Sequence, residues 1–202
     1  MGSVGRPLPS LTVLFVDTTT GKPVPANHPG EIWIKGPMVF KGYLGNAEAT
    51  ANCMTNGFFK TGDIGYQDEL GNMYVTDRIK ELIKYKGFQV APAELEGILA
   101  SHPSVSDVAV CGRYVDAIAS EVPVAFLVPA KGVTGGLKLA EEVIMWFNEQ
   151  VAAHKQLRGG VVWMESIPKS PTGKLMRRVL RTVTDQGIGA VKYDDTAVSS
   201  RL

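Results

Sequence analysis

Short apolar runs separated by turn residues dominate the first part of the chain. Residues 11–17 are mostly apolar and rich in strand-forming side chains, and residues 31–36 alternate between apolar and polar. The polar, glycine-containing segment at 18–23 supplies a turn between them, so the pattern predicts a β-hairpin. A second hairpin is expected from the apolar runs at 64–66 and 73–77, which flank a loop that contains a glycine.

The segment that joins the two hairpins has a weaker pattern. Residues 47–51 favour a short helix, and residues 56–63 are interpreted as a turn, a strand and a second turn. Together with the hairpins, these pieces predict that the first part of the chain consists mostly of strands and turns.

The second part of the chain combines strand and helix periods. Pro92 suits the first turn of a helix, and Leu95, Ile98 and Leu99 form an apolar stripe behind it. The expected elements are, in order, a basic hairpin after residue 77, a helix from 92, strands at 105–111 and 123–128, a helix through 139–150, a strand at 161–164 and a basic helix at 175–183. This order predicts a compact α+β domain, so the fold class of the chain is α+β.

The composition is that of an ordinary soluble globular protein. The 202 residues are 45% hydrophobic and 20% charged, and a net charge of +1 indicates neither a nucleic-acid partner nor a membrane surface. No apolar run approaches the roughly 20 residues that a membrane span needs, and Pro7 and Pro9 break any secretory signal. Cys53 and Cys111 lack metal-ligand spacing, and we expect free thiols in a reducing compartment.

Positive charge is concentrated after the second hairpin. Lys80 and Lys84 are four residues apart, which places both on one face of a helix or a strand. In a strand, Leu82 and Lys86 would join that face. Gly87 then permits a sharp bend or the close approach of a ligand to the backbone. Taken alone, the segment is more typical of a solvated basic hairpin.

Three stretches in one order resemble a single protein family. They are residues 77–96, the sequence Phe59-Lys60-Thr61-Gly62-Asp63, and the sequence Ile167-Pro168-Lys169-Ser170-Pro171-Thr172-Gly173-Lys174-Leu175-Met176-Arg177-Arg178. They resemble the AMP-forming acyl-CoA synthetases of the adenylate-forming superfamily, especially the branch of 4-coumarate–CoA ligase and firefly luciferase. The resemblance extends from about residue 2 to about residue 181.

The resemblance implies four parts along the chain. Residues 1–77 match the β-rich end, a remnant, of a large N-terminal adenylation domain, and residues 78–80 match a hinge. Residues 81–184 match a mobile C-terminal AMP-binding-enzyme domain, a compact α+β lid, and residues 185–202 are expected to be a flexible tail. The family's Ser/Thr/Gly-rich phosphate loop and Thr-Glu motif have no counterpart in this sequence. The missing N-terminal adenylation domain is therefore an expected partner, and we expect the chain alone to be inactive.

The resemblance also implies an adenylation site. Lys174 follows Ser170-Pro171-Thr172-Gly173, in which proline and glycine favour a tight turn that can hold a lysine at its tip. Lys174 matches the catalytic lysine that contacts the acid and the phosphate. Asp63, whose carboxylate can accept two hydroxyl donors, matches the residue that holds the ribose of ATP. Arg78 matches an arginine that also contacts the nucleotide.

Five further residues match positions that serve the transfer of the acyl group to CoA. Lys80 matches the hinge position, about which the C-terminal domain turns between the two half-reactions. Lys84 and Gln89 match residues that face the site only in the thioester-forming orientation. Lys86 and Gly87 match positions where CoA runs along the backbone. The candidate catalytic lysines are therefore Lys174, Lys84 and Lys80.

The implied activity is that of an AMP-forming acid–CoA ligase. Such an enzyme converts ATP, a small carboxylic acid and CoA into acyl-CoA, AMP and pyrophosphate through an acyl-adenylate. ATP or AMP and CoA are the implied cofactors. Mg²⁺ is implied by the family, but no ligand for it is visible in this sequence.

Two alternatives stay open at this point. One is a stand-alone accessory or binding module with the same fold, and the other is part of a luciferase-like or carrier-protein-loading adenylating enzyme. The matches at Lys84, Lys86, Gly87 and Gln89 favour a parent that uses CoA.

The chain ends with Ser200-Arg201-Leu202. This tripeptide resembles the Ser-Lys-Leu peroxisomal address, with arginine keeping the positive charge. It predicts a location in the peroxisome, with the cytoplasm as the alternative.

Overall fold

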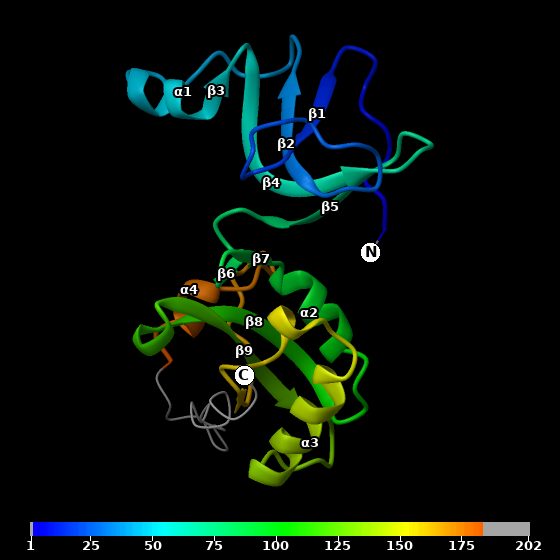
Figure 1. Cartoon of the computed structure of the whole chain (residues 1–202), viewed down its shortest axis with the longest axis vertical. Coiled ribbons are helices and arrows are strands. Elements are labelled where there is room, and N and C mark those ends of the chain that lie inside the picture. The colour runs from blue at the N-terminus through cyan, green and yellow to red at the C-terminus, as the bar shows by residue number, and fades with distance from the viewer. Residues whose placement is uncertain (1, 184–202) are drawn as a thin grey trace. The chain divides into compact units, whose positions relative to one another are not determined.

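The computed structural model describes residues 2–183, which form two compact units (Figure 1). Unit 1 ends at Lys80, and unit 2 begins at Glu81. Each unit has its own β-strands and at least one helix, so the α+β class predicted from the sequence is confirmed. The C-terminal tripeptide and the segment expected to be a tail lie outside the described residues.

Unit 1 is built on one antiparallel sheet of five strands. Its elements are β1 (Thr12–Val16), β2 (Gly30–Lys35), α1 (Ala47–Cys53), β3 (Met54–Thr55), β4 (Phe58–Gln67) and β5 (Met73–Arg78). Strand β4 is central, because it pairs with β2, β3 and β5, and β1 pairs with β2. Both predicted hairpins are confirmed. The predicted short helix is also present, and its Asn46 cap accepts a hydrogen bond from the Ala49 N–H at 2.9 Å.

The prediction of a second turn at the end of residues 56–63 is wrong, because β4 is continuous through this region. Gly62 has a φ of +74°, and its N–H donates to the Glu31 carboxylate at 3.2 Å. The pairing of β4 with β2 shifts register here, between Glu31 and Trp33. The glycine therefore forms an irregularity inside a strand, where the local sequence suggested that the strand would end.

Unit 2 has the order of elements that the sequence predicts. They are β6 (Ile83–Tyr85), β7 (Phe88–Val90), α2 (Pro92–Leu99), β8 (Val105–Val115), the 3-10 helix η1 (Asp116–Ile118), β9 (Ser120–Pro129), α3 (Leu137–Asn148), the 3-10 helix η2 (Ala153–Lys155), β10 (Val161–Trp163) and α4 (Arg177–Leu180). Strands β6 and β7 form a two-stranded sheet of their own. In the larger sheet, β9 lies between β8, which is antiparallel to it, and β10, which is parallel.

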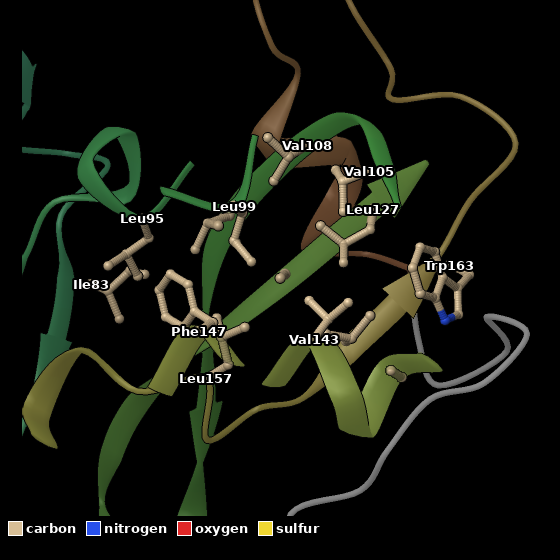
Figure 2. Packing of buried hydrophobic residues seen from close by; sticks show 14 of the residues in the cluster. Ile83, Leu95, Leu99, Val105, Val108, Leu127, Val143, Phe147, Leu157 and Trp163 are labelled. Atoms are coloured by element: carbon tan, nitrogen blue, oxygen red, sulfur yellow. The ribbon is translucent and has the colours of Figure 1, made fainter. Parts of the chain in front are cut away.

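Both faces of the larger sheet are buried, which explains the nearly continuous apolar runs in its strands. Successive side chains of a strand point to opposite faces. On β9, Ala125 and Leu127 therefore join one core cluster, whereas Val124 and Phe126 join another. The first cluster includes residues of α2 and α3, and Figure 2 shows Phe147 of α3 in the middle of this packing.

The second cluster packs against the segment that follows β10. Ile167 and Leu180 from this segment are buried against Cys111 of β8. Burial raises the pKa of the Cys111 thiol to about 11. Both cysteines of the chain are free thiols in the structure.

The last helix is shorter than predicted. The sequence pattern favoured a helix over 175–183, but α4 includes only Arg177–Leu180. Leu175 instead forms an antiparallel bridge with Lys169, and the Met176 N–H donates to the Pro168 carbonyl at 2.9 Å. These bonds keep the chain extended until the helix begins. Within residues 2–183, no helix is long and apolar enough to cross a membrane.

A substitution at Phe147 tests whether this residue belongs to the core of unit 2. Its side chain is fully buried, so Phe147→Ala removes a large apolar group and leaves a cavity. We expect the free energy of unfolding to fall by about 3–5 kcal/mol. Urea denaturation in a Trp33→Phe background measures this, because the remaining tryptophans both lie in unit 2. The control is Met145→Ala on the same helix, where the side chain is 66% exposed and little change is expected. Equal losses in the two variants would contradict the assignment of Phe147 to the core.

Candidate functional site

Asp63 and Arg78 lie side by side at the end of the β4–β5 ladder. They are partners in the strand register, and the Arg78 Nε lies 3.1 Å from the Asp63 Oδ1. The backbone of Asp63 is held by Thr61, whose hydroxyl accepts its N–H at 3.0 Å and donates to the Ile32 carbonyl at 2.7 Å. The side chains are 32% and 62% exposed. This surface ion pair contributes little to stability, and it offers a carboxylate acceptor next to a guanidinium donor.

Lys84 and Gln89 face each other across the β6–β7 hairpin. Both residues are exposed, whereas their neighbours Ile83 and Val90 are fully buried. The apolar side of the hairpin is therefore anchored in the core of unit 2, and the polar side presents these two residues to the exterior.

Lys86 and Gly87 form the two-residue turn of the same hairpin. Their φ angles are +44° and +86°, which is the arrangement of a type I′ turn. A Cβ built on Gly87 meets nothing within 4 Å. The backbone conformation, and not close packing within the chain, therefore calls for glycine at this position.

Two residues that the sequence analysis missed hold this hairpin in place. The buried Ser120 hydroxyl accepts the Lys86 N–H at 2.7 Å and donates to the Lys84 carbonyl at 3.0 Å. The Glu121 carboxylate accepts the Lys84 N–H at 2.8 Å. The only sequence signal for them is that two polar residues open an otherwise apolar strand, β9.

The expectation that Lys80 and Lys84 share one face is wrong. Lys80 lies in a turn, and β6 begins only at Ile83. Leu82, which was expected to lie on the same face, is buried, whereas Lys84 is exposed. Lys86 lies in the turn beyond the strand. The period-2 argument fails because only three residues here are in a strand.

Lys80 lies between two residues that are each held by a contact within its own unit. The Ile79 N–H donates to the Gly62 carbonyl at 2.9 Å, within unit 1. Glu81 is ion-paired with Arg177, within unit 2. A backbone rotation at Lys80 can therefore occur without breaking either of these two contacts.

Lys174 lies at a tight turn, as the sequence predicts. The Gly173 N–H donates to the Ser170 carbonyl at 2.8 Å, and the Ser170 N–H donates to the Lys174 carbonyl at 2.8 Å. The Ser170 hydroxyl also accepts the Lys174 N–H at 3.2 Å. The bridge between Lys169 and Leu175 closes the base of this loop, so the exposed Lys174 is held by its backbone.

The side chains of Lys80, Lys84 and Lys174 form no ion pair with any residue of the described part of the chain. By contrast, Lys155 and Lys169 are each 2.6 Å from a carboxylate oxygen, of Glu94 and Asp107 respectively. An ammonium group without an acidic neighbour can place its charge on a phosphate or carboxylate ligand.

Arg177 is the centre of a polar cluster that the sequence analysis also missed. Its guanidinium binds the Glu81 carboxylate and both carboxylate oxygens of Glu96, the latter at 2.7 and 2.8 Å. Its Nε donates to the Val110 carbonyl at 3.2 Å, and Glu96 accepts the Val110 N–H at 2.8 Å. Because β8 is an edge strand, Glu96 and Arg177 here take the place of a neighbouring strand.

The described residues contain no cluster of three metal-binding side chains. Between residues 2 and 183, no three side chains from His, Cys, Asp and Glu lie close enough together to bind a metal. The carboxylate of Asp63, one of the two nucleotide candidates, is paired with Arg78. No metal-dependent step is therefore assigned to residues of this chain.

Two family models match the chain. The model described as "AMP-binding enzyme C-terminal domain" matches residues 94–174, and the model described as "AMP-binding enzyme" matches residues 1–44. These matches fall in unit 2 and unit 1, respectively.

Similar proteins of known sequence and structure agree with these matches. The chain is 49% identical over 180 residues to "4-coumarate–CoA ligase-like 9" from Oryza sativa subsp. japonica, covering 89% of this chain and 32% of that protein. It is 45% identical over 188 residues to "4-coumarate–CoA ligase 1" from Solanum tuberosum, covering 93% and 34%. It is similar to the crystal structure of ATP-bound MatB from Rhodopseudomonas palustris, with a TM-score of 0.81, 34% identity, and coverage of 89% and 35%. The chain thus spans about a third of the length of these proteins.

Substitutions at Gly87 test the conformational reason for glycine in the hairpin turn. A β-branched residue is strained at positive φ, so Gly87→Val is expected to lower the free energy of unfolding by about 1–2 kcal/mol. Gly87→Asn is the matched control, because asparagine tolerates this conformation, and its loss should be clearly smaller. Urea denaturation of the 202-residue chain gives both values. If asparagine is as damaging as valine, positive φ is not the reason for glycine.

Proposed function

Because the chain belongs to the family of AMP-binding enzymes in the adenylate-forming superfamily, we propose that it is the C-terminal part of an AMP-forming acid–CoA ligase. The first half-reaction transfers AMP from ATP to a small carboxylic acid and releases pyrophosphate. In the second, the CoA thiol attacks the acyl-adenylate and releases AMP. The remainder of the adenylation domain supplies the acid pocket and the phosphate loop in this proposal.

In the proposed first step, Lys174 binds the carboxylate and the phosphate that react. Its ammonium group offsets the negative charge that develops on the phosphate, and the Ser170–Gly173 turn fixes its backbone. Asp63 accepts the ribose hydroxyls, and Arg78 beside it contacts the nucleotide. The ion pair between them orients both side chains before the nucleotide arrives.

In the proposed second step, the β6–β7 hairpin faces the acyl-adenylate. Lys84 and Gln89 contact the phosphate side, and CoA runs along the backbone at Lys86 and Gly87, where the open space around the glycine leaves room for it. A rotation at Lys80 exchanges the two arrangements. Such a hinge needs only a few residues that absorb the change in backbone angles.

The observation that carries this proposal is the placement of the two lysines. Lys84 lies on strand β6 and Lys174 at a turn of the same unit, and neither side chain forms an ion pair within the described residues. In this proposal, one rigid placement of unit 2 does not bring both lysines to the same phosphate. A hinge before Glu81 allows each lysine to serve one half-reaction.

The experiment uses a chimera in which this chain replaces the matching C-terminal third of the Solanum tuberosum ligase. We expect Lys174→Ala to slow formation of the acyl-adenylate by on the order of a hundredfold or more, and to spare thioester formation from pre-made acyl-adenylate. Lys84→Ala should do the reverse. ATP–pyrophosphate exchange measures the first step, and acyl-CoA release from the acyl-adenylate measures the second.

The control for this experiment is Lys138→Ala, an exposed lysine on α3 that should affect neither step. If both variants slow both steps to the same extent, the proposal that each lysine serves one half-reaction is contradicted. A wild-type chimera without either activity would instead favour a binding module. The 202-residue chain alone should give no ATP–pyrophosphate exchange, because one lysine without a phosphate loop does not orient two substrates.

The C-terminal tripeptide supports a second proposal, that the protein is imported into peroxisomes. A fluorescent protein that ends in the last 17 residues of this sequence, 186–202, should collect in peroxisomes. The matched control ends at residue 199 and should stay diffuse. A diffuse signal from both fusions supports the cytoplasm instead.

A further inference from the structure

We propose that Arg177 is a positioning residue for Lys174, which couples the turn carrying this lysine to the hinge end of unit 2 at Glu81. This inference rests on the proposed function of Lys174 in adenylation. Nothing in the proposed reaction requires Arg177 to touch a substrate, so its effect is exerted through the backbone between it and the lysine.

The contacts of Arg177 use all three nitrogens of its guanidinium. Nη1 binds Glu81, Nη2 binds Glu96 at 2.7 and 2.8 Å, and Nε binds the Val110 carbonyl at 3.2 Å. The side chain is only 13% exposed. A planar, forked group satisfies these three partners at once, whereas the ammonium of a lysine is a single point charge and cannot.

The path from Arg177 to Lys174 is short and fixed. Only two residues separate them, and both are held: Leu175 forms a bridge with Lys169, and the Met176 N–H donates to the Pro168 carbonyl at 2.9 Å. The C-terminal limb of the turn therefore continues directly into the ion-paired arginine. A displacement of Arg177 is transmitted to the backbone of Lys174.

The path from Arg177 to the hinge is equally short. Glu81 is the first residue of unit 2, and its carboxylate is bound by Arg177. Since Ile79 is hydrogen-bonded within unit 1, a single residue, Lys80, lies between the two tethered positions. Without the contact to Arg177, the backbone segment that is not tethered to either unit would include residue 81 as well as residue 80. A rotation at the hinge would then be transmitted less directly to the Lys174 turn.

The thioester-step hairpin depends on other contacts. Strands β6 and β7 are fixed by Ser120, by Glu121 and by the buried side chains of Ile83 and Val90. The hydrogen bonds of Arg177 described above go instead to Glu81, Glu96 and Val110. Weakening Arg177 should therefore affect adenylation more than thioester formation, whereas a merely structural role would slow both steps alike.

The surface pair between Lys169 and Asp107 also lies at the base of the Lys174 turn, at 2.6 Å. Its two side chains are 41% and 36% exposed. Exposed pairs of this kind are weak, so Arg177, whose side chain is 13% exposed, is the stronger of the two anchors.

The test compares Arg177→Lys and Glu81→Gln in the chimera with the Solanum tuberosum ligase. Glu94→Gln is the matched control, because it removes a carboxylate from the same helix as Glu96 and breaks only the pair with Lys155. We expect Arg177→Lys to lower kcat for acyl-adenylate formation by on the order of a hundredfold. The KM for ATP and the rate from pre-made acyl-adenylate should stay close to wild type.

The variant Glu81→Gln guards against simple misfolding, because this side chain is 32% exposed and its loss should hardly change the unfolding midpoint. It is expected to lower adenylation in the same direction as Arg177→Lys, by a smaller factor, and Glu94→Gln is expected to change nothing. Equal losses in both half-reactions, or full adenylation activity in Arg177→Lys, would overturn the proposal.

A measurement without catalysis separates this inference from the proposed function. In the 202-residue chain, the Ser170 and Gly173 amides are hydrogen-bonded within the turn. If Arg177 anchors the turn, Arg177→Lys should accelerate their hydrogen exchange by roughly tenfold or more, while Glu94→Gln leaves it unchanged. Unchanged exchange in Arg177→Lys overturns the inference even if the chimera is active. Faster exchange with an inactive wild-type chimera supports the anchoring and refutes the proposed function instead.

Discussion

The ion pair between Arg177 and Glu96 is the contact on which the arrangement of unit 2 depends. It lies at the open edge of β8, where it satisfies both backbone groups of Val110, and its side chains are only 13% and 14% exposed. A hydrogen bond to a charged group typically contributes about 1.5–3 kcal/mol, and two such bonds join this pair. The pair also reaches Glu81, so it joins four segments: the start of the unit, α2, the edge strand and the beginning of α4.

The core of unit 2 anchors the two segments that carry the candidate residues Lys84 and Lys174. Ile83 and Val90 anchor the hairpin that presents Lys84, and Leu180 anchors the segment that follows Lys174. In both places, turn chemistry then decides where the lysine lies: two consecutive positive φ angles in the hairpin, and a serine-capped turn before Lys174. Apolar packing fixes the position of each loop, and hydrogen bonds fix its shape.

The nucleotide-binding candidates lie in unit 1, whereas Lys84 and Lys174 lie in unit 2. Asp63 and Arg78, which suit the neutral ribose and the nucleotide, are fixed by the register of a sheet in unit 1. Of the candidate lysines, Lys84 lies on strand β6 and Lys174 at a turn, both in unit 2, whereas Lys80 is the last residue of unit 1. In the proposed function, groups that bind one substrate throughout are positioned precisely by a rigid strand pair. Groups that act in different steps need a domain that can rotate between the steps.

Local signals in the sequence determined most of the fold. Alternating and helical periods gave the order of elements in unit 2, Pro92 marked the start of α2, and Pro171 with Gly173 predicted the Lys174 turn. These features depend on residues that are neighbours in the chain, so a local pattern is enough to find them. The resemblance to a known family then supplied the eight candidate residues.

Only the tertiary structure decided the remaining features. Strand β4 continues through Gly62 because Glu31, 31 positions away, accepts its N–H. Of the adjacent Arg177 and Arg178, the first is turned inward because Glu96 and Glu81, 81 and 96 positions away, meet it there. Ser120 and Glu121 support a hairpin more than 30 positions before them. A charged or polar residue has the same local pattern whether it is solvated or paired, because its partner is chosen by the fold and not by its neighbours in sequence.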